Sequence, residues 1–276
     1  MTLFKQDGSF TISQQWADLG NTALRYVDIA GGAGRPLLLL HEMGGSLDSW
    51  GPVLPHLVPR RRTILSDMRG AGGSEKIRAP FTMDDFSNDI VSLLNFLGIA
   101  EPIDVAGIAI GGCIALRVAA WHPERVHRVA PINPPTDAVG RSGEILRERA
   151  EIAETRGMRC VVESALARSW PDHLRTNRKT FEAYAARFIC NDPDSYAHIL
   201  RALGGVSFDG VFEKIRCPTV FIAGRDDLVR TPDATKSASK HVEGAAFVEI
   251  EGGHIASMQA PRPVAHALNS AFSDCG

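Results

Sequence analysis

One short stretch, residues 105–113 with the sequence VAGIAIGGC, constrains the fold of this 276-residue chain more than any other. It continues an apolar run that predicts a buried strand, and it leads into a segment with the spacing of a helix. Gly107, Gly111 and Gly112 stand where a sharp strand-to-helix turn needs residues without a Cβ atom. The stretch therefore predicts a tight turn between a central strand and the helix that follows it.

This arrangement is that of a nucleophile elbow, G-x-S-x-G, in which the turn lifts a serine above the edge of a sheet. The middle residue of the motif is Ala109 in this chain. A methyl group cannot attack a carbonyl carbon, so the motif is present without its nucleophile.

Apolar runs bounded by glycine, proline and polar turn residues predict the strands of the chain. Strands are expected at residues 10–16, 24–28, 35–40, 63–67, 103–106, 126–132, 217–223 and 246–250. Helices are expected at residues 47–57, 83–97, 110–121, 232–240 and 263–272, and a loop at residues 31–34. Strands that alternate with helices in this way favour a parallel sheet covered on both faces.

The pattern changes after residues 134–135, where no convincing strand occurs until about residue 210. Four segments in this region have helical spacing: residues 144–155, 158–167, 178–188 and 195–203. We interpret the region as a helical cap over the sheet edge. The expected organisation is an α/β core formed by residues 1–133 and 213–276, with the cap at residues 134–212.

Composition argues against several functional classes for this chain. Thirty basic and 32 acidic residues give a net charge of −2, and no basic block suggests a nucleic acid or a membrane surface as partner. The first residues lack the layout of a signal peptide. The cysteines are scattered without metal-ligand spacing, which favours free thiols in a reducing compartment: Cys113, Cys160, Cys190, Cys217 and Cys275. We expect a cytoplasmic protein with a small-molecule substrate, no metal and no organic cofactor; a homodimer stays open.

Three strand ends carry the residues that could perform chemistry. They are the elbow at Ala109, the turn at Asp226 and Asp227, and the turn that ends in His254. In a doubly wound sheet, ligand sites lie at the carboxyl ends of the strands. A lone histidine in a glycine turn is often structural, but here it follows an elbow and an acidic turn in the chain order of a hydrolase triad.

Other motifs extend the likeness along the chain. HEMGG at residues 41–45 resembles an HG-x-x-G oxyanion loop, and DMRGAGGS at residues 67–74 resembles a D-x-R-G-x-G-x-S turn. HPERV at residues 122–126 and the G-H-x-x-x-x-x-x-P ending at residues 253–261 complete the set. On these motifs the chain resembles the α/β-hydrolase superfamily, most of all the capped members that include 3-oxoadipate enol-lactonases, small carboxylesterases and C–C bond hydrolases.

The resemblance implies an α/β-hydrolase fold: a mostly parallel eight-stranded sheet with helices on both faces and a helical cap. It implies that His254 is the general base and that Asp227 orients the imidazole. It also implies that the backbone N–H groups of Met43 and Ile110 form an oxyanion hole, and that Ala109 occupies the place of the nucleophile.

The chain departs from the family pattern at two positions. Glu42 replaces the usual glycine beside the oxyanion loop, and we expect its side chain to point to solvent; inside the pocket it could carry a proton. One extra residue separates the acidic turn from the next proline, so Asp226 remains an alternative acid to Asp227. We expect His41 to position its loop by hydrogen bonds rather than to act in catalysis.

Some residues of the predicted cap could contact a substrate, for example its carboxylate. The candidates are Trp170, Arg168 and Arg187. Cys113 lies one turn inside the helix that follows the elbow, where we expect a buried structural thiol and not a substitute nucleophile.

Three hypotheses explain Ala109. The first is an engineered Ser→Ala change in a hydrolase of a small ester, lactone or activated ketone, which would otherwise react through an acyl-enzyme. The second is a natural alanine in an enzyme that uses His254 as a base on water or on the substrate, as in a lyase or decarboxylase. The third is a non-catalytic protein that binds a small molecule.

Overall fold

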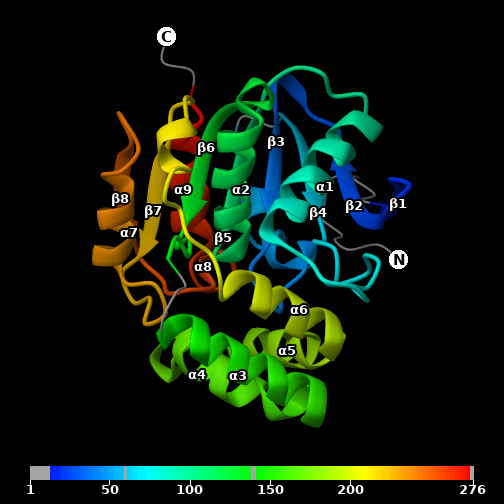
Figure 1. Ribbon diagram of the computed structural model, residues 1–276. Helices are drawn as coiled ribbons and strands as arrows, with labels where there is room; N and C mark the ends of the chain where they lie inside the picture. Colours follow the sequence, from blue (N-terminus) through cyan, green and yellow to red (C-terminus); the bar gives the residue numbers. More distant parts are fainter. Residues whose placement is uncertain (1–12, 59–60, 138–140, 274–276) are drawn as a thin grey trace.

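The computed structural model describes residues 13–58, 61–137 and 141–273, and these are arranged around one eight-stranded sheet (Figure 1). The strand order is β1-β2-β4-β3-β5-β6-β7-β8; β2 is antiparallel to both of its neighbours, and every pair from β4 to β8 is parallel. The strands are β1 (Gln15–Asp18), β2 (Ala23–Ile29), β3 (Gly32–Leu40), β4 (Arg61–Ser66), β5 (Ile103–Ile108), β6 (Val126–Ile132), β7 (Val220–Gly224) and β8 (Ala246–Ile250). The predicted α/β class with a mostly parallel eight-stranded sheet is confirmed.

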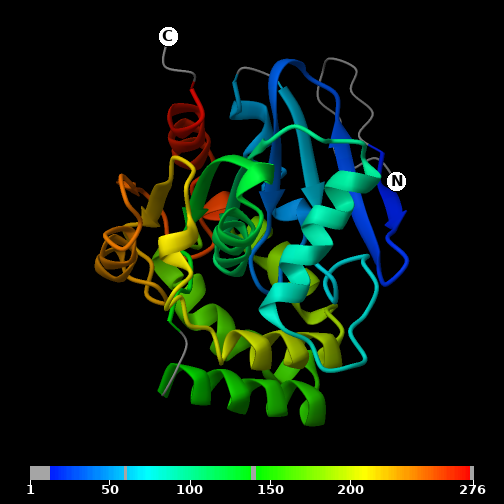
Figure 2. The same cartoon turned by 45° about the horizontal axis from the view of Figure 1, so that its top comes forward.

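Helices cover both faces of this sheet (Figures 1 and 2). The helices of the first face are α1 (Met83–Phe96), α2 (Ile110–Trp121) and α7 (Pro232–Ser239), and those of the second are α8 (Ala256–Gln259) and α9 (Pro261–Ala271). Strand β3 shows why both faces must be covered. Its side chains alternate, so that Leu38 and Leu40 pack in the core of the first face and Leu37 and Leu39 in the core of the second.

Local signals define the ends of α1. The Thr82 hydroxyl accepts the N–H of Asp85, while the Asp85 carboxylate accepts the N–H of Thr82, and this reciprocal pair caps the helix at its start. Gly98 follows the helix with a φ of +65°. The helix thus begins at the predicted residue, 83, and ends one residue before the predicted end, 97.

Four helices lie together beyond one end of the sheet, and we call them the cap (Figures 1 and 2). They are α3 (Arg141–Arg156), α4 (Val162–Ser169), α5 (Arg178–Ile189) and α6 (Pro193–Leu203). The cap has an apolar core of its own, which includes Trp170, Tyr184 and Phe188. Polar contacts tie it to the loop that precedes α1, because the Ser195 hydroxyl accepts the N–H of Ile77 at 2.9 Å.

The structure differs from the predicted elements in several places. The helix expected at residues 158–167 is divided into a 3₁₀ turn, Met158–Cys160, and helix α4. Strand β3 begins at Gly32 and pairs there with Arg61, so residues 31–34 are not all loop. Residues 47–57 form two 3₁₀ turns, Leu47–Trp50 and Leu54–His56, and no α-helix, because Pro52 and Pro55 each lack the N–H that a continuing helix needs. The first strand was expected at residues 10–16, of which residues 10–12 lie outside the described residues.

Within the described residues, no helix combines the length and the apolar character needed to cross a lipid bilayer.

Candidate active site

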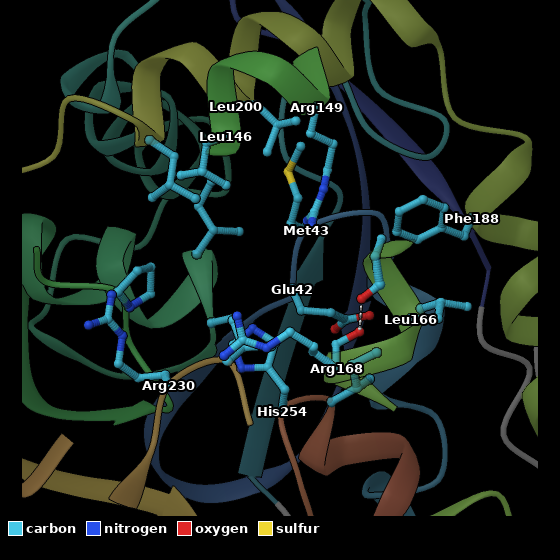
Figure 3. Close-up of a pocket in the computed structure, with 18 of the residues that line it drawn as sticks. Glu42, Met43, Leu146, Arg149, Leu166, Arg168, Phe188, Leu200, Arg230 and His254 are labelled. Atoms are coloured by element: carbon cyan, nitrogen blue, oxygen red, sulfur yellow. Dashed lines mark hydrogen bonds between the residues drawn. The ribbon is translucent and has the colours of Figure 1, made fainter. Parts of the chain in front are cut away.

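The carboxyl ends of four parallel strands lie under the cap. The loops after β3, β5, β7 and β8 carry Glu42, Ala109, Asp227 and His254, respectively. These strands run parallel, so their carboxyl ends share one edge of the sheet. A pocket opens there between the sheet edge and the cap, and Glu42, Ala109 and His254 line it (Figure 3).

Ala109 occupies the strained corner of the elbow. Its backbone has φ 50° and ψ −118°, a conformation that costs a non-glycine residue about 1–3 kcal/mol. A Cβ at Gly107 would lie 2.1 Å from the carbonyl oxygen of Gly111, and a Cβ at Gly111 would lie 2.4 Å from that of Leu40. The turn therefore requires glycine at both positions, and it points the Ala109 methyl group into the pocket.

His254 and Asp227 form a close pair, and His254 lines the same pocket as Ala109. Nδ1 of His254 lies 2.7 Å from Oδ2 of Asp227. The other oxygen of Asp227 accepts the backbone N–H groups of Val229 and Arg230, at 2.7 and 2.8 Å. Because Asp227 holds Nδ1 as a donor, Nε2 of His254 is left as the acceptor of the ring.

Met43 and Ile110, whose backbone N–H groups are the predicted oxyanion donors, both belong to the pocket lining. Met43 follows β3 and Ile110 begins α2. Among the described residues, neither N–H group has a hydrogen-bond acceptor. Donors arranged in this way can stabilise an oxyanion, and the N-terminal end of α2 adds the positive end of its dipole.

His41 is buried and bonded on both sides of its ring. Nε2 accepts the N–H of Met68 at 3.0 Å, so Nδ1 is the protonated nitrogen and donates to the carbonyl oxygen of Glu42 at 2.8 Å. These bonds tie the loop after β3 to the loop after β4. The ring therefore holds the loop after β3 in place.

The sequence predicts that the Glu42 side chain points to solvent, and this prediction is wrong. The exposed fraction of Glu42 is 1%. Oε1 accepts the hydroxyl groups of Ser49 at 2.7 Å and of Tyr184 at 2.9 Å. Burial, with a further contribution from the Glu42 charge, raises the pKa of Tyr184 well above 10, so its phenol stays a donor. The side chain turns inward because cap helix α5 covers it, and this contact cannot be read from the loop sequence.

The cap residues named from the sequence fall into two groups. Arg168 lines the pocket and donates to the carbonyl oxygen of Leu228, next to Asp227. Trp170 is buried within the cap, where its indole N–H donates to the Leu174 carbonyl at 2.9 Å. Arg187 donates to Ser49 Oγ at 3.0 Å. Trp170 and Arg187 therefore lie behind the lining of this pocket and not in it.

Sequence reasoning missed two arginines and an asparagine. Arg149 of α3 and Arg230 of the loop after β7 line the pocket. Asn133 is buried after β6, where its Oδ1 accepts the N–H of Gly224 at 2.8 Å and its Nδ2 donates to the Gly253 carbonyl at 3.0 Å. Nothing marks the arginines in the sequence, but an asparagine directly after a buried strand could have been recognised as a link between strand ends.

Cys113 supplies no substitute nucleophile to this site. Burial raises the pKa of the Cys113 thiol to about 12, so this cysteine holds no thiolate near neutral pH. Among the described residues, no three His, Cys, Asp or Glu side chains cluster in a way that could hold a metal ion.

Comparisons with known proteins agree with this fold. A family model for the α/β-hydrolase fold matches residues 35–151. The chain is 28% identical over 246 residues to a protein of Azorhizobium caulinodans with the provisional name carbamate hydrolase RutD, covering 88% of this chain and 92% of that protein. It is 25% identical over 252 residues to 3-oxoadipate enol-lactonase 2 of Acinetobacter baylyi, covering 91% of this chain and 93% of that protein.

A solved structure shows the same similarity. The enol-lactonase of Burkholderia xenovorans LB400 superposes with a TM-score of 0.88 at 25% identity, covering 94% of this chain and 100% of that one. The chain thus has the α/β-hydrolase fold, with its candidate site at the strand ends. Within this class, the chain is a hydrolase that resembles enol-lactonases and related enzymes acting on lactones and esters.

Proposed function

We propose that this chain hydrolyses a small anionic lactone, ester or carbamate, and that His254 activates a water molecule in place of a serine nucleophile. The observation that carries the proposal is the His254–Asp227 pair, joined at 2.7 Å, whose histidine lines the same pocket as Ala109. A chain without any proton transfer to perform would not need a buried acid aligned on this imidazole.

The proposed reaction needs no acyl-enzyme. Nε2 of His254 takes a proton from water as the water oxygen forms a bond to the substrate carbonyl carbon. The N–H groups of Met43 and Ile110 stabilise the tetrahedral oxyanion, and Asp227 stabilises the imidazolium. The bond from the carbonyl carbon to the leaving group then breaks, and His254 returns the proton to the leaving oxygen or nitrogen.

Ala109 suits this route because its methyl group leaves the space of a serine hydroxyl for water. The residue is nevertheless held at a φ of 50°, as a nucleophile in an elbow would be. This conformation also directs the first N–H groups of α2 at the pocket. The strained turn therefore supports oxyanion stabilisation whether or not residue 109 reacts.

The charge of the pocket supports an anionic substrate. Three arginines line it, Arg149, Arg168 and Arg230, against the one carboxylate of Glu42. Arg230 pairs with Asp137, whereas Arg149 has no carboxylate partner among the described residues. The Arg149 guanidinium therefore suits a substrate carboxylate, which it can bind through two parallel hydrogen bonds.

The test compares this chain with its Ala109→Ser and His254→Ala variants on p-nitrophenyl acetate and on a panel of lactones with and without a carboxylate. We expect steady hydrolysis without a burst, no labelling by a fluorophosphonate, and loss of activity in His254→Ala. Ala109→Ser should introduce both a burst and labelling. Activity in Ala109→Ser alone would instead favour a serine hydrolase whose nucleophile is replaced, and binding without turnover in both would favour a binding protein.

A further inference from the structure

The loop after β8 is held by a side chain that follows it closely in the sequence. Gln259 is the last residue of α8, and its Oε1 atom accepts the N–H groups of Gly253 at 3.0 Å and of Ile255 at 3.1 Å. These are the backbone donors on either side of His254. One acceptor atom thus fixes the backbone before and after the histidine.

The other polar atom of this side chain reaches the cap. Nε2 of Gln259 donates to the backbone carbonyl of Ser169 at 2.9 Å, and Ser169 is the last residue of cap helix α4. The opposite orientation of the amide would set its NH₂ group against two N–H donors and its oxygen against a carbonyl, so the partners define which end is which. We call residues 168–174, which contain this carbonyl, the cap end segment.

The cap end segment contacts the loops after β7 and β8 at two more points. Arg168 donates to the carbonyl oxygen of Leu228, the residue after Asp227. Leu174 lies against the loop after β8, where a Cβ atom at Gly253 would come within 2.7 Å of its Cδ1 atom. One segment of the cap therefore touches the loop of the acid as well as the loop of the histidine.

Asn133 holds the loop after β8 by different groups. Its Nδ2 atom donates to the carbonyl oxygens of Gly253 and His254, at 3.0 and 3.3 Å, and its Oδ1 atom accepts a donor at the end of β7. Asn133 thus ties the loop to the core. Gln259 ties the same loop to the cap end segment, part of which lines the pocket.

We propose that Gln259 is a positioning residue, which fixes the direction of His254 through Oε1 and makes that direction depend, through Nε2, on a cap seated on the core. The direction matters because the ring nitrogen of a general base must lie within hydrogen-bond reach of the proton that it takes. The inference rests on the proposed function only in giving His254 a proton to transfer.

Two substitutions separate the two ends of the side chain. Gln259→Glu keeps an oxygen for the two N–H groups, but it turns a second oxygen toward the Ser169 carbonyl and so breaks the bond to the cap. Gln259→Leu removes all three bonds. Ser195→Ala is the control, because it removes a different bond between cap and core, the one to the Ile77 N–H, and does not alter the pocket lining.

Two measurements need no substrate. Hydrogen exchange followed by mass spectrometry reports on the cap end segment, where both Gln259 variants should exchange roughly fivefold faster and Ser195→Ala should exchange at the original rate. The low-field proton NMR signal of the Nδ1–H group between His254 and Asp227 reports on the pair. It should persist in Gln259→Glu and in Ser195→Ala, and exchange with water should remove it in Gln259→Leu.

Hydrolysis of p-nitrophenyl acetate adds a third measurement, and this ester is neutral, so the new charge of Gln259→Glu does not repel it. Gln259→Leu should lower kcat by roughly tenfold to a hundredfold, because a small misplacement of a reacting group has an effect of that order. Its KM should change much less. Gln259→Glu should recover most of the lost kcat, and Ser195→Ala should keep the original value.

A low-field signal that survives in Gln259→Leu would overturn the inference, because the histidine would then be held without Gln259. Equal losses in Ser195→Ala would overturn it too, since a generally loosened cap would explain both. So would unchanged exchange of the cap end segment in Gln259→Glu, a result that decides even where Gln259→Leu does not fold. The expected exchange and NMR results without any hydrolysis would count against the proposed function alone, whereas hydrolysis with both results absent would count against this inference alone.

Discussion

Asp226 and Asp227 are neighbours in the sequence and have opposite surroundings in the structure. The Asp227 side chain is fully buried against His254, whereas the Asp226 side chain is 39% exposed and lies 3.7 Å from His173. The turn after β7 thus directs one carboxylate into the site and the other to the surface.

This difference predicts the outcome of a paired substitution. Asp227→Asn should lower kcat by about 10⁴-fold, because an amide can present NH₂ to Nδ1 of His254 and thereby favour the wrong tautomer. Asp226→Asn should change kcat less than twofold, since its carboxylate touches no group of the site. Steady-state hydrolysis of the best ester or lactone measures both, and the reverse ranking would contradict the assignment of the acid.

Asn133 should act as a positioning residue for the loop after β8, which carries His254. It bridges the N–H of Gly224 and the carbonyl oxygen of Gly253, so Asn133→Ala leaves both groups buried without this partner. We expect a loss of about 1–3 kcal/mol in the free energy of unfolding, and a fall in kcat larger than any change in KM.

Asn269→Ala is the matched control for that substitution. Asn269 also bonds two backbone groups, the Val58 N–H and the His56 carbonyl, but it lies on α9 and does not line the pocket. It should affect the urea midpoint without affecting kcat. If the two asparagine variants lowered kcat equally, the positioning role of Asn133 would be wrong.

The bond between Tyr184 and Glu42 should contribute to the stability of the cap on the core. Tyr184→Phe removes a donor to a buried carboxylate, and the expected cost is about 1.5–3 kcal/mol because one partner is charged. Tyr26→Phe, which removes a neutral hydrogen bond to Gln15, should cost only about 0.5–1.5 kcal/mol. Urea unfolding followed by circular dichroism gives both values; similar losses would speak against a charged Glu42.

Asp192 should make the stability depend on pH in the acid range. The Arg78 guanidinium, together with donors from Ser195, holds the pKa of the Asp192 carboxyl well below its usual value of 3.8. Because the folded pKa is the lower one, this stabilisation is fully present above about pH 5, and it is lost as the pH falls below 4 toward the folded pKa.

A pH series of urea midpoints tests this behaviour. Asp192→Asn should destabilise the chain at pH 7 by about 1 kcal/mol, since the carboxylate also caps α6. The difference from the unmodified chain should shrink as the pH falls from 5 to 3. Asp194→Asn, an exposed neighbour 3.9 Å from Arg78, should show almost no effect at any of these pH values. A gap for Asp192→Asn that stays constant with pH would contradict the argument.

The sequence was informative where the physical requirement is local. The elbow was predictable because Gly107 and Gly111 are demanded by backbone contacts within a few residues or with the adjacent strand. Strand β3 was predictable because Leu37–Leu40 are buried on both faces. The helix predicted at residues 47–57 is wrong. The apolar spacing there is typical of a helix, but Pro52 and Pro55 lack the backbone N–H groups that a continuing helix needs.

The remaining features depend on partners that are distant in the sequence. The direction of Glu42 is set by Tyr184, 142 residues away, and no property of the oxyanion loop reveals it. Arg149 and Arg187 both lie on cap helices, and only the packing of these helices determines that Arg149 reaches the pocket while Arg187 lies behind it. Asp226 and Asp227 could not be separated because a one-residue difference in a turn reverses the direction of a side chain.

The strained conformation of Ala109 has an evolutionary consequence. Any residue with a Cβ atom bears the same backbone cost at this corner, so replacing one small side chain by another leaves the turn and its donors intact. Most serine codons differ from an alanine codon by a single base. Position 109 is thus a point at which a lineage can exchange one reaction route for another in a single mutational step, while the rest of the site is inherited unchanged.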